Sequence, residues 1–311
     1  MLLNHRELSA FLAIARLGTI NRAAQAAGMT QPALSRSLKR LEETLGAQLF
    51  RRLPGGMVLT EFGRALQRHA EMMEFETTRV VEEIHMLSGA ATGVVRVGLV
   101  PSVVASLFRS ALLDVNRTAP NIQIRVIEGA GDQMLEAVVR GTVDFAVIGR
   151  LQVDAEPGVV MVPLGVEEVC VAARSEHPIF SKADLTLADL GDYRWALPEK
   201  GNAIWHGFND LFRRRGLEPP TPTVATNSVH TLKSIVSEDD YLTMMTRIVF
   251  EVEERYGLMR PVPLPEALWQ REIMVVRRPR SELLPAARLL LGELERQAGA
   301  LDGRDAGGEG V

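Results

Sequence analysis

The sequence contains a single cysteine, Cys170, among its 311 residues. One thiol excludes an intramolecular disulfide and a zinc site built from cysteines. The six histidines are scattered, with no His-x-x-x-His pair. Cys170 stands in a strand-like run, EEVCVAAR, so we expect a small buried hydrophobic residue, with a redox sensor as the alternative. We also expect no metal site and no cofactor.

Long hydrophobic runs are missing too: no stretch approaches the roughly 18 to 20 apolar residues of a membrane-spanning helix. The first residues, MLLNHRELSAFLAIARLG, carry charges where a signal peptide would be apolar. The chain has no P-loop, no G-x-S-x-G elbow, no H-E-x-x-H pair and no dinucleotide fingerprint. These absences predict a cytoplasmic protein that is not an enzyme, with no catalytic residue and no membrane partner.

Hydrophobic residues make up 46% of the chain and charged residues 24%, which is typical of globular domains. The length predicts two or three compact units. The net charge of −4 is unevenly distributed, because residues 1–69 hold ten Lys/Arg and four Asp/Glu, while the other 242 residues hold 25 and 35. A head of charge +6 on a body of charge −10 is compatible with a DNA-facing N-terminus.

The head has the pattern of three helices, over residues 4–17, 19–28 and 31–45. A glycine marks the end of each: Gly18, Gly28 and Gly46. Thr19 and Thr30 are the expected N-caps of the second and third helices. Two helices joined by so short a turn present the second one to the DNA major groove. The third helix is therefore the predicted recognition helix.

The recognition helix has leucines at 34, 38, 41 and 45 on one stripe and polar residues largely off it. We expect Gln31, Ser35 and Arg36 to reach base edges, with a solvated helix face as the alternative. A two-stranded wing fits AQLFRRLPGGMVLT, and its basic residues would contact phosphates or the minor groove. The predicted DNA-binding residues are Thr30, Gln31, Pro32, Ser35, Arg36, Lys39, Arg40, Arg51 and Arg52.

A long helix is predicted from Glu61 to about Gly89, with apolar residues repeating every seven positions. The pattern predicts a dimerisation seam of about three heptads, which Ala70 and Thr77 weaken. The alternative is a helix packed on its own chain. The expected seam residues are Leu66, Met73, Val80, Ile84 and Leu87. GAATG at 89–93 then predicts a hinge.

The remainder alternates strands with amphipathic helices, which predicts α/β units with a mostly parallel sheet. Strands are expected at 94–100, 122–127, 143–148, 168–173, 223–226, 241–245 and 272–276. Helices are expected at 103–116, 131–140, 205–215, 229–237 and 282–297. We expect residues 299–311 to form a disordered tail.

The head contains the segment FLAIARLGTINRAAQAAGMTQPALSRSLKRLEETLGAQLFRR followed by LTEFG, including the pair Ala23–Ala24 and the run Gln31–Ser35. On these residues the head resembles that of the LysR-type transcriptional regulators. It implies a winged helix-turn-helix, homodimers or homotetramers that bind an inverted-repeat operator and bend the DNA, and contact with RNA polymerase in an activator. Segments 128–149 and 162–179 are similar to the family's effector domain.

The resemblance implies four parts: a winged helix-turn-helix over 1–60, a linker helix and hinge over 61–92, an effector-binding domain over 93–298, and the tail. The effector domain would have two periplasmic-binding-protein-like α/β lobes. Lobe I would comprise 93–163 and 269–298, and lobe II 164–268. The family's usual Gly-x-Gly turn is replaced here by Glu238, Asp239 and Asp240. The resemblance therefore does not predict the shape of the pocket edge at this turn of lobe II.

Ligands of paired α/β lobes bind beyond the carboxyl ends of strands, where helix N-termini expose backbone donors. Arg150 and Lys200 near such a helix terminus would suit a small anion such as a carboxylate. A solvated Arg150 that connects the lobes, and a Ser102 that only caps a helix, are the alternatives. The predicted effector-binding residues are Ser102, Gly129, Ala130, Gly149, Arg150, Lys200, Gly201, Asn202, Asn227 and Ser228.

The sequence thus predicts a sequence-specific transcriptional regulator modulated by a small-molecule effector. The alternative is a DNA-binding regulator whose second region serves only oligomerisation, without a ligand.

The recognition helix generates a first prediction. Replacement Arg36→Ala should lower binding to the cognate operator far more than binding to unrelated DNA, because a base contact adds sequence information that a phosphate contact lacks. Gel retardation on cognate and scrambled duplexes measures both losses. Equal losses on the two duplexes would refute the assignment.

Overall fold

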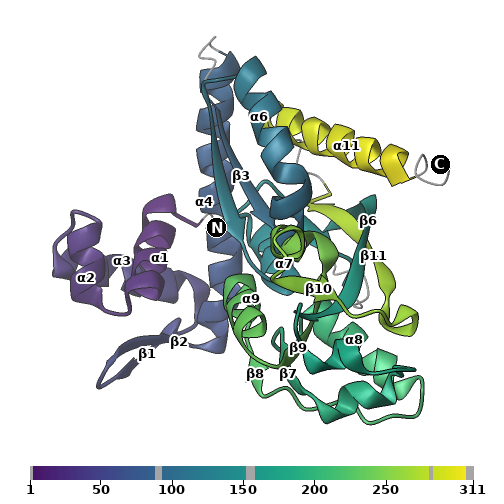
Figure 1. The fold of residues 1–311 in the computed structure, drawn as a ribbon. Coiled ribbons are helices and arrows are strands. Elements are labelled where there is room, and N and C mark those ends of the chain that lie inside the picture. Colours follow the sequence, from purple (N-terminus) through teal and green to yellow (C-terminus); the bar gives the residue numbers. More distant parts are fainter. Residues whose placement is uncertain (1–2, 88–92, 152–157, 280–282, 306–311) are drawn as a thin grey trace. The chain divides into compact units, whose positions relative to one another are not determined.

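The computed structural model describes residues 3–87, 93–151, 158–279 and 283–305. The chain divides into two compact units, with the main division after Gly89 (Figure 1). Residues 89–92 of the hinge predicted at 89–93 lie outside the described residues, and Gly93 is the first residue of a strand. The first unit contains α1 (His5–Leu17), α2 (Ile20–Ala26), α3 (Gln31–Leu45), β1 (Phe50–Leu53), β2 (Gly56–Leu59) and α4 (Glu61–Leu87).

The three predicted head helices are confirmed, and their ends follow from local chemistry. The Thr19 hydroxyl accepts a hydrogen bond from the Arg22 amide at 3.3 Å, and Gly18 ends α1 with a φ of 72°. Thr30 occupies the N-cap position of α3, but its side chain accepts no capping hydrogen bond, so that part of the prediction is wrong. The helices enclose a core around Phe11, in which the leucine stripe is buried as far as Leu41.

The predicted wing is an antiparallel hairpin in which Phe50 pairs with Leu59 and Leu53 with Gly56. The Met57 amide donates to the Gly18 carbonyl oxygen at 2.7 Å, which fixes the hairpin against the end of α1. Gly56 has a φ of 136°, and a Cβ there would lie 2.5 Å from that same oxygen. Glycine is therefore required at this contact.

In the second unit, nine strands of the described residues form one sheet in the order β4-β3-β5-β11-β6-β9-β7-β8, with β10 beside β6. The strands are β3 (Gly93–Leu99), β4 (Ile122–Glu128), β5 (Phe145–Gly149), β6 (Val160–Arg174), β7 (Arg194–Leu197), β8 (Val224–Ala225), β9 (Tyr241–Thr246), β10 (Met259–Pro261) and β11 (Trp269–Arg277).

The α-helices of this unit are α5 (Pro101–Val103), α6 (Arg109–Thr118), α7 (Gly131–Arg140), α8 (Ala203–Arg213), α9 (Val229–Glu238), α10 (Glu251–Arg255) and α11 (Pro285–Asp305). A π-helical segment, Val104–Phe108, joins α5 to α6. Short 3-10 helices cover Pro178–Ser181, Ala188–Asp192, Arg247–Phe250 and Pro265–Ala267. Helix α11 lies against α6, where Arg296 pairs with Asp114 (Figure 1).

Strands β6 and β11 pair with each other at the centre of the sheet. On one side β11 pairs with β5, which leads to the half with β3 and β4, and on the other side β6 pairs with β9, which leads to the half with β7 and β8. The prediction of a mostly parallel sheet is wrong at this centre, because β6 and β11 run antiparallel to each other and β5 and β9 run antiparallel to them. Only the flanking pairs β3 with β4 and β5, and β7 with β8 and β9, are parallel. The lobe boundaries predicted at 163/164 and 268/269 fall within β6 and at the start of β11.

Two further expectations need correction. Strand β6 begins at Val160, not at 168, because Pro163 lies beside a β-bulge opposite Ile273/Met274 and does not end the strand. The prediction of a disordered tail is wrong for residues 299–305, because helix α11 continues to Asp305. Earlier in the same helix, Leu294 and Ala298 are buried. Residues 306–311 of the predicted tail lie outside the described part of the chain.

Trp269 at the start of β11 lies directly over α8. A Cβ at Gly207 would lie 1.1 Å from Cη2 of the indole ring, so the helix can approach the ring only where a side chain is missing. This close approach fixes α8 against a strand that both halves of the sheet share. The same helix presents Phe208 and Phe212 to a core around Trp195, which is fully buried.

Replacement Gly207→Ala should therefore destabilise the second unit by about 3 kcal/mol, because ring and helix must separate. The matched control is Gly292→Ala in the exposed interior of α11, where a Cβ meets nothing within 4 Å. That change should stabilise by about 0.5–1 kcal/mol through helix propensity. Urea unfolding measures both, and equal effects would contradict the packing argument.

His177 is buried before the first 3-10 helix, with 1% of its surface exposed. Its Nδ1 accepts a hydrogen bond from the Ile179 amide at 3.0 Å, and its ring packs on Tyr193. Burial lowers the pKa of His177 below its ordinary 6.5; Asp240 opposes this shift and Arg174 adds to it. The folded protein thus keeps this imidazole neutral in a range where the unfolded chain would protonate it.

Because the folded pKa lies below the unfolded value, the stability that His177 contributes is complete above pH 6.5 and falls as the pH drops towards the folded pKa. We expect His177→Gln to flatten the dependence of the free energy of unfolding on pH as the pH falls below 6.5. Urea titrations at several pH values measure this slope. His206→Gln, at an exposed position, is the control and should keep the wild-type slope.

Candidate DNA-binding surface and effector pocket

The recognition helix α3 presents a continuous polar face to solvent. Of the nine predicted DNA-binding residues, Ser35 is half-buried and the other eight are exposed. Arg36 comes two positions after the buried Leu34 and so lies on the side of α3 that turns away from the core, while Ser35 lies at the edge between the two sides. The predicted base-contacting residues are thus free to meet a groove.

The cations of this face are only lightly engaged by acidic groups. Lys39 lies 3.6 Å from Glu43, and Arg40 lies 3.6 Å from Glu7, both with exposed cationic side chains. Such pairs contribute little and exchange readily with a phosphate. Within the described residues no acidic side chain pairs with Arg36 or with the wing residues Arg51 and Arg52 on β1.

The predicted seam on α4 divides into two parts. Leu66 packs against the core of the first unit, and Ala70 beside it is 1% exposed, so this end of the helix is packed on its own chain. Beyond it, Met73, Val80 and Ile84 are 48%, 53% and 55% exposed. Leu87 lies in the last turn of the helix, and its burial is outside what the structure describes.

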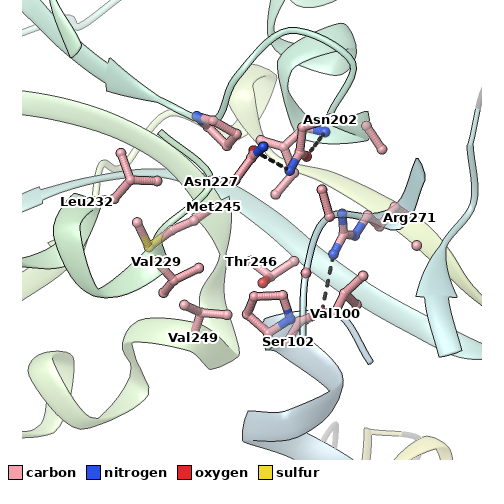
Figure 2. A pocket seen from close by; sticks show the side chains of 18 of the residues that line it. Val100, Ser102, Asn202, Asn227, Val229, Leu232, Met245, Thr246, Val249 and Arg271 are labelled. Carbon is pink, nitrogen blue, oxygen red and sulfur yellow. Dashed lines mark hydrogen bonds between the residues drawn. The ribbon is translucent and has the colours of Figure 1, made fainter. Parts of the chain in front are cut away.

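A pocket lies between the two halves of the second unit, at the carboxyl ends of β3, β4, β5 and β9 (Figure 2). In the described part of the chain, four helical segments begin at its wall, with Pro101, Gly131, Ala203 and Val229 as their first residues. The first of these segments continues through the π-helical turn to Thr118. Unpaired backbone donors at helix N-termini favour negative or electron-rich ligand groups.

Arg271 supplies the charged group among the lining residues of this pocket. Its Nη2 donates to the Ser102 hydroxyl at 3.2 Å (Figure 2). That hydroxyl in turn donates to Oε1 of Glu167 at 3.1 Å. The guanidinium also contacts Glu167 directly. A Cβ at Gly149 would lie 2.8 Å from the guanidinium carbon, so a larger residue there would displace the guanidinium from its present position.

The opposite wall is held by two asparagines. Asn202 Oδ1 accepts from the Ile204 amide at 3.0 Å and so caps α8. Its Nδ2 donates to Asn227 Oδ1 at 3.4 Å (Figure 2). The same Asn227 oxygen accepts from the Glu199 amide at 3.2 Å. These bonds fix both amides at the rim of the pocket. The remaining wall is apolar, with Leu232 and Met245 among its members.

Six of the ten predicted effector-binding residues line this pocket: Ser102, Gly129, Ala130, Gly149, Asn202 and Asn227. The other four, Arg150, Lys200, Gly201 and Ser228, are not among the lining residues. Arg150 instead pairs with Glu272 at 2.5 Å, and its side chain is 57% exposed. It comes one residue after Gly149, which lines the pocket, and successive residues of an extended chain point to opposite faces. Ser228 caps α9 by accepting from the Thr231 amide at 3.2 Å.

Sequence reasoning missed Arg271 and Thr246. Thr246 is the last residue of β9, so the strand-end rule that selected Gly149 also selects it. Arg271 is the third residue of β11, and its place in the pocket depends on the pairing of β11 with β6, where it lies opposite Glu167. The acidic turn at Glu238 to Asp240 lies at the other end of β9, where Asp239 pairs with Arg194 and Asp240 with Arg174.

Cys170 faces a core cluster with Leu232 and Met245 and is 3% exposed, as predicted. Burial raises the pKa of its thiol to about 12, and Glu168 adds to the shift. The thiol is therefore protonated at neutral pH and a poor nucleophile. The described residues contain no group of three or more potential metal ligands, and none of their helices has the length and apolar character needed to cross a bilayer.

These two units define a class of protein: a winged helix-turn-helix reader joined to a two-lobed ligand-binding domain. The profile of the bacterial regulatory helix-turn-helix protein, lysR family, matches residues 5–64, and that of the LysR substrate binding domain matches residues 88–299. The chain belongs to the LysR family. It is a DNA-binding transcriptional regulator with an effector-binding domain, and it is not an enzyme.

Among curated proteins, the chain is similar to the HTH-type transcriptional regulator GbpR of Azospirillum brasilense, with 32% identity over 261 residues, covering 83% of this chain and 76% of that protein. Its fold is similar to that of ArgP from Mycobacterium tuberculosis, with a TM-score of 0.70, 18% identity, and coverage of 96% and 98%. It is also similar to full-length CbnR in complex with its target DNA, with a TM-score of 0.66, 18% identity, and coverage of 95% and 100%.

Proposed function

We propose that this regulator binds an inverted-repeat operator as a homo-oligomer and that a small effector in the pocket of Figure 2 modulates operator binding or activation. One observation carries the effector proposal: four helix N-termini and the Arg271 guanidinium converge on one pocket. A carboxylate is the ligand group that this arrangement suits, because backbone donors and a cation meet there.

The cation proposed to face the ligand carboxylate differs from the one predicted from the sequence. Arg150 and Lys200 do not line the pocket, so Arg271 takes over the role of the cation that would face the carboxylate. The pocket holds about 60 Å³ of accessible space, which suits a ligand group of a few heavy atoms. Apolar walls beside the polar groups would accept a short hydrocarbon part.

Regulation requires that the ligand bind two arrangements of the protein with different affinities. Strands β6 and β11 pass between the lobes beside the pocket, so a ligand that draws the lobes together acts on these two strands. A changed lobe arrangement would alter how the subunits of the oligomer meet the operator. In an activator, the partner that reads this change would be RNA polymerase.

The effector proposal is tested with a library of small carboxylates and their amides. A ligand at a hundred times its Kd should stabilise the protein by about 2.7 kcal/mol and raise its melting temperature. Arg271→Gln should abolish the response, whereas Arg150→Gln should keep it. The same compound should change gel retardation of genomic fragments selected by the protein.

A protein whose second region serves only oligomerisation would give a different result. It would retard its operator normally, and no compound would change either its melting temperature or its operator binding. A ligand whose stabilisation survives Arg271→Gln but disappears in Arg150→Gln would move the site to the outer face of β11.

The exposed part of the α4 seam supports the dimer proposal, since Met73, Val80 and Ile84 repeat at coiled-coil spacing. Val80→Glu should dissociate the dimer at micromolar concentration, because a buried unpaired charge costs about 3–5 kcal/mol. Thr78→Glu, at an exposed position on the other side of the helix, is the control and should remain dimeric. Analytical ultracentrifugation measures both, and a dimeric Val80→Glu protein would contradict the seam.

A further inference from the structure

Glu167 stands out among the groups next to the effector pocket. Its side chain is 7% exposed, and both Nε and Nη2 of Arg271 approach the same oxygen, Oε1. Ser102 donates to that oxygen as well. The second oxygen, Oε2, is buried and has no hydrogen-bond partner. Glu167 is thus a buried carboxylate that is held through only one of its two oxygens.

Such a contact leaves the guanidinium incompletely used. Two parallel N–H···O bonds to two oxygens are the stronger geometry for arginine and a carboxylate. Glu167 does not provide this geometry, since its Oε2 takes no part. A carboxylate entering from the pocket side, where Arg271 is 15% exposed, could supply both oxygens at once.

A displaced Glu167 side chain would need somewhere to go. Glu167 also lines a neighbouring cavity of about 380 Å³, together with Ser106 and Arg247. In that cavity Arg247 already pairs with Glu254 at 2.8 Å and lies 3.5 Å from Glu168, the next residue along β6. The displaced carboxylate would therefore turn towards a cation that it shares with these two acidic groups, without entering an apolar core.

The position of the pair in the sheet gives this exchange a consequence. Glu167 on β6 is the direct cross-strand partner of Arg271 on β11, and these are the two strands shared by both halves of the sheet. Ser102, which bonds both side chains, is the second residue of the helical segment after β3. A ligand that separates the pair acts on three elements at once.

We propose that Glu167 is a built-in competitor for the anionic group of the effector: without ligand it occupies Arg271, and the carboxylate of the ligand displaces it. This inference rests on the proposed function, because it assumes a carboxylate in the pocket. It assigns to Glu167 the role of setting the ligand affinity and of holding the ligand-free arrangement of β6 and β11.

The test uses the full chain, with sodium propionate as the probe and propionamide as the neutral analogue of equal size, at constant ionic strength. The Kd for propionate is measured by calorimetric titration and by the concentration dependence of the melting temperature. Glu167→Gln keeps the shape of the side chain but removes its charge. We expect it to lower the Kd for propionate about tenfold, equivalent to about 1.4 kcal/mol, and to leave the response to propionamide unchanged.

The matched control is Glu272→Gln, which removes the exposed partner of Arg150 and should bind propionate like the wild type. The double variant Glu167→Gln with Arg271→Gln should lose the gain. Ser102→Ala, which removes one hydrogen bond that holds Glu167, should shift the Kd in the same direction by a smaller factor. Ser102→Ala keeps the test decisive if the Glu167→Gln protein does not fold.

The outcomes separate this inference from the proposed function. A Kd in Glu167→Gln and Ser102→Ala that is equal to or higher than the wild-type value would overturn the competitor role while leaving a carboxylate effector in the pocket. A gain that persists in the double variant would also overturn it, because Arg271 would then not be the group released. Absence of propionate binding in every protein would contradict the anionic effector itself.

Discussion

The antiparallel pairing of β6 with β11 is the constraint on which the second unit depends. Each half of the sheet has parallel pairs of its own, and these two strands alone among the described ones join the halves through a shared ladder. The same ladder sets Glu167 opposite Arg271, although 104 positions separate them in the chain. The connection between the lobes and the charge of the pocket therefore have one structural origin.

Much of the first unit could be predicted because its information is local. Helix ends depend on a capping residue or glycine a few positions away, and the buried stripe of α3 follows from leucine spacing alone. The glycine, alanine and asparagine positions of the pocket follow from a similar rule, since backbone donors gather wherever strands end and helices begin. The uncapped Thr30 shows the limit, because a suitable residue at the N-cap need not form the bond.

The charged groups of the pocket could not be predicted in this way, because their placement depends on strand register. Arg150 follows a predicted strand end, yet one further residue along an extended chain turns its side chain to the other face and onto Glu272. The guanidinium of Arg271 takes its present position beside Gly149, a residue on a strand far away in sequence that leaves room for it. Similarly, a proline at position 163 suggests from the sequence that a strand ends there. The strand continues because Pro163 lies beside a β-bulge in the pairing with β11, which only the structure reveals.

The burial of Cys170 has a practical consequence. Since this thiol is protonated and enclosed by the core beneath the pocket, a maleimide dye would leave it unmodified in the folded protein. A cysteine introduced at a solvent-facing position would then be the one thiol that reacts. Fluorescent reporters of lobe movement could be attached to the otherwise natural chain, with its own cysteine left in place.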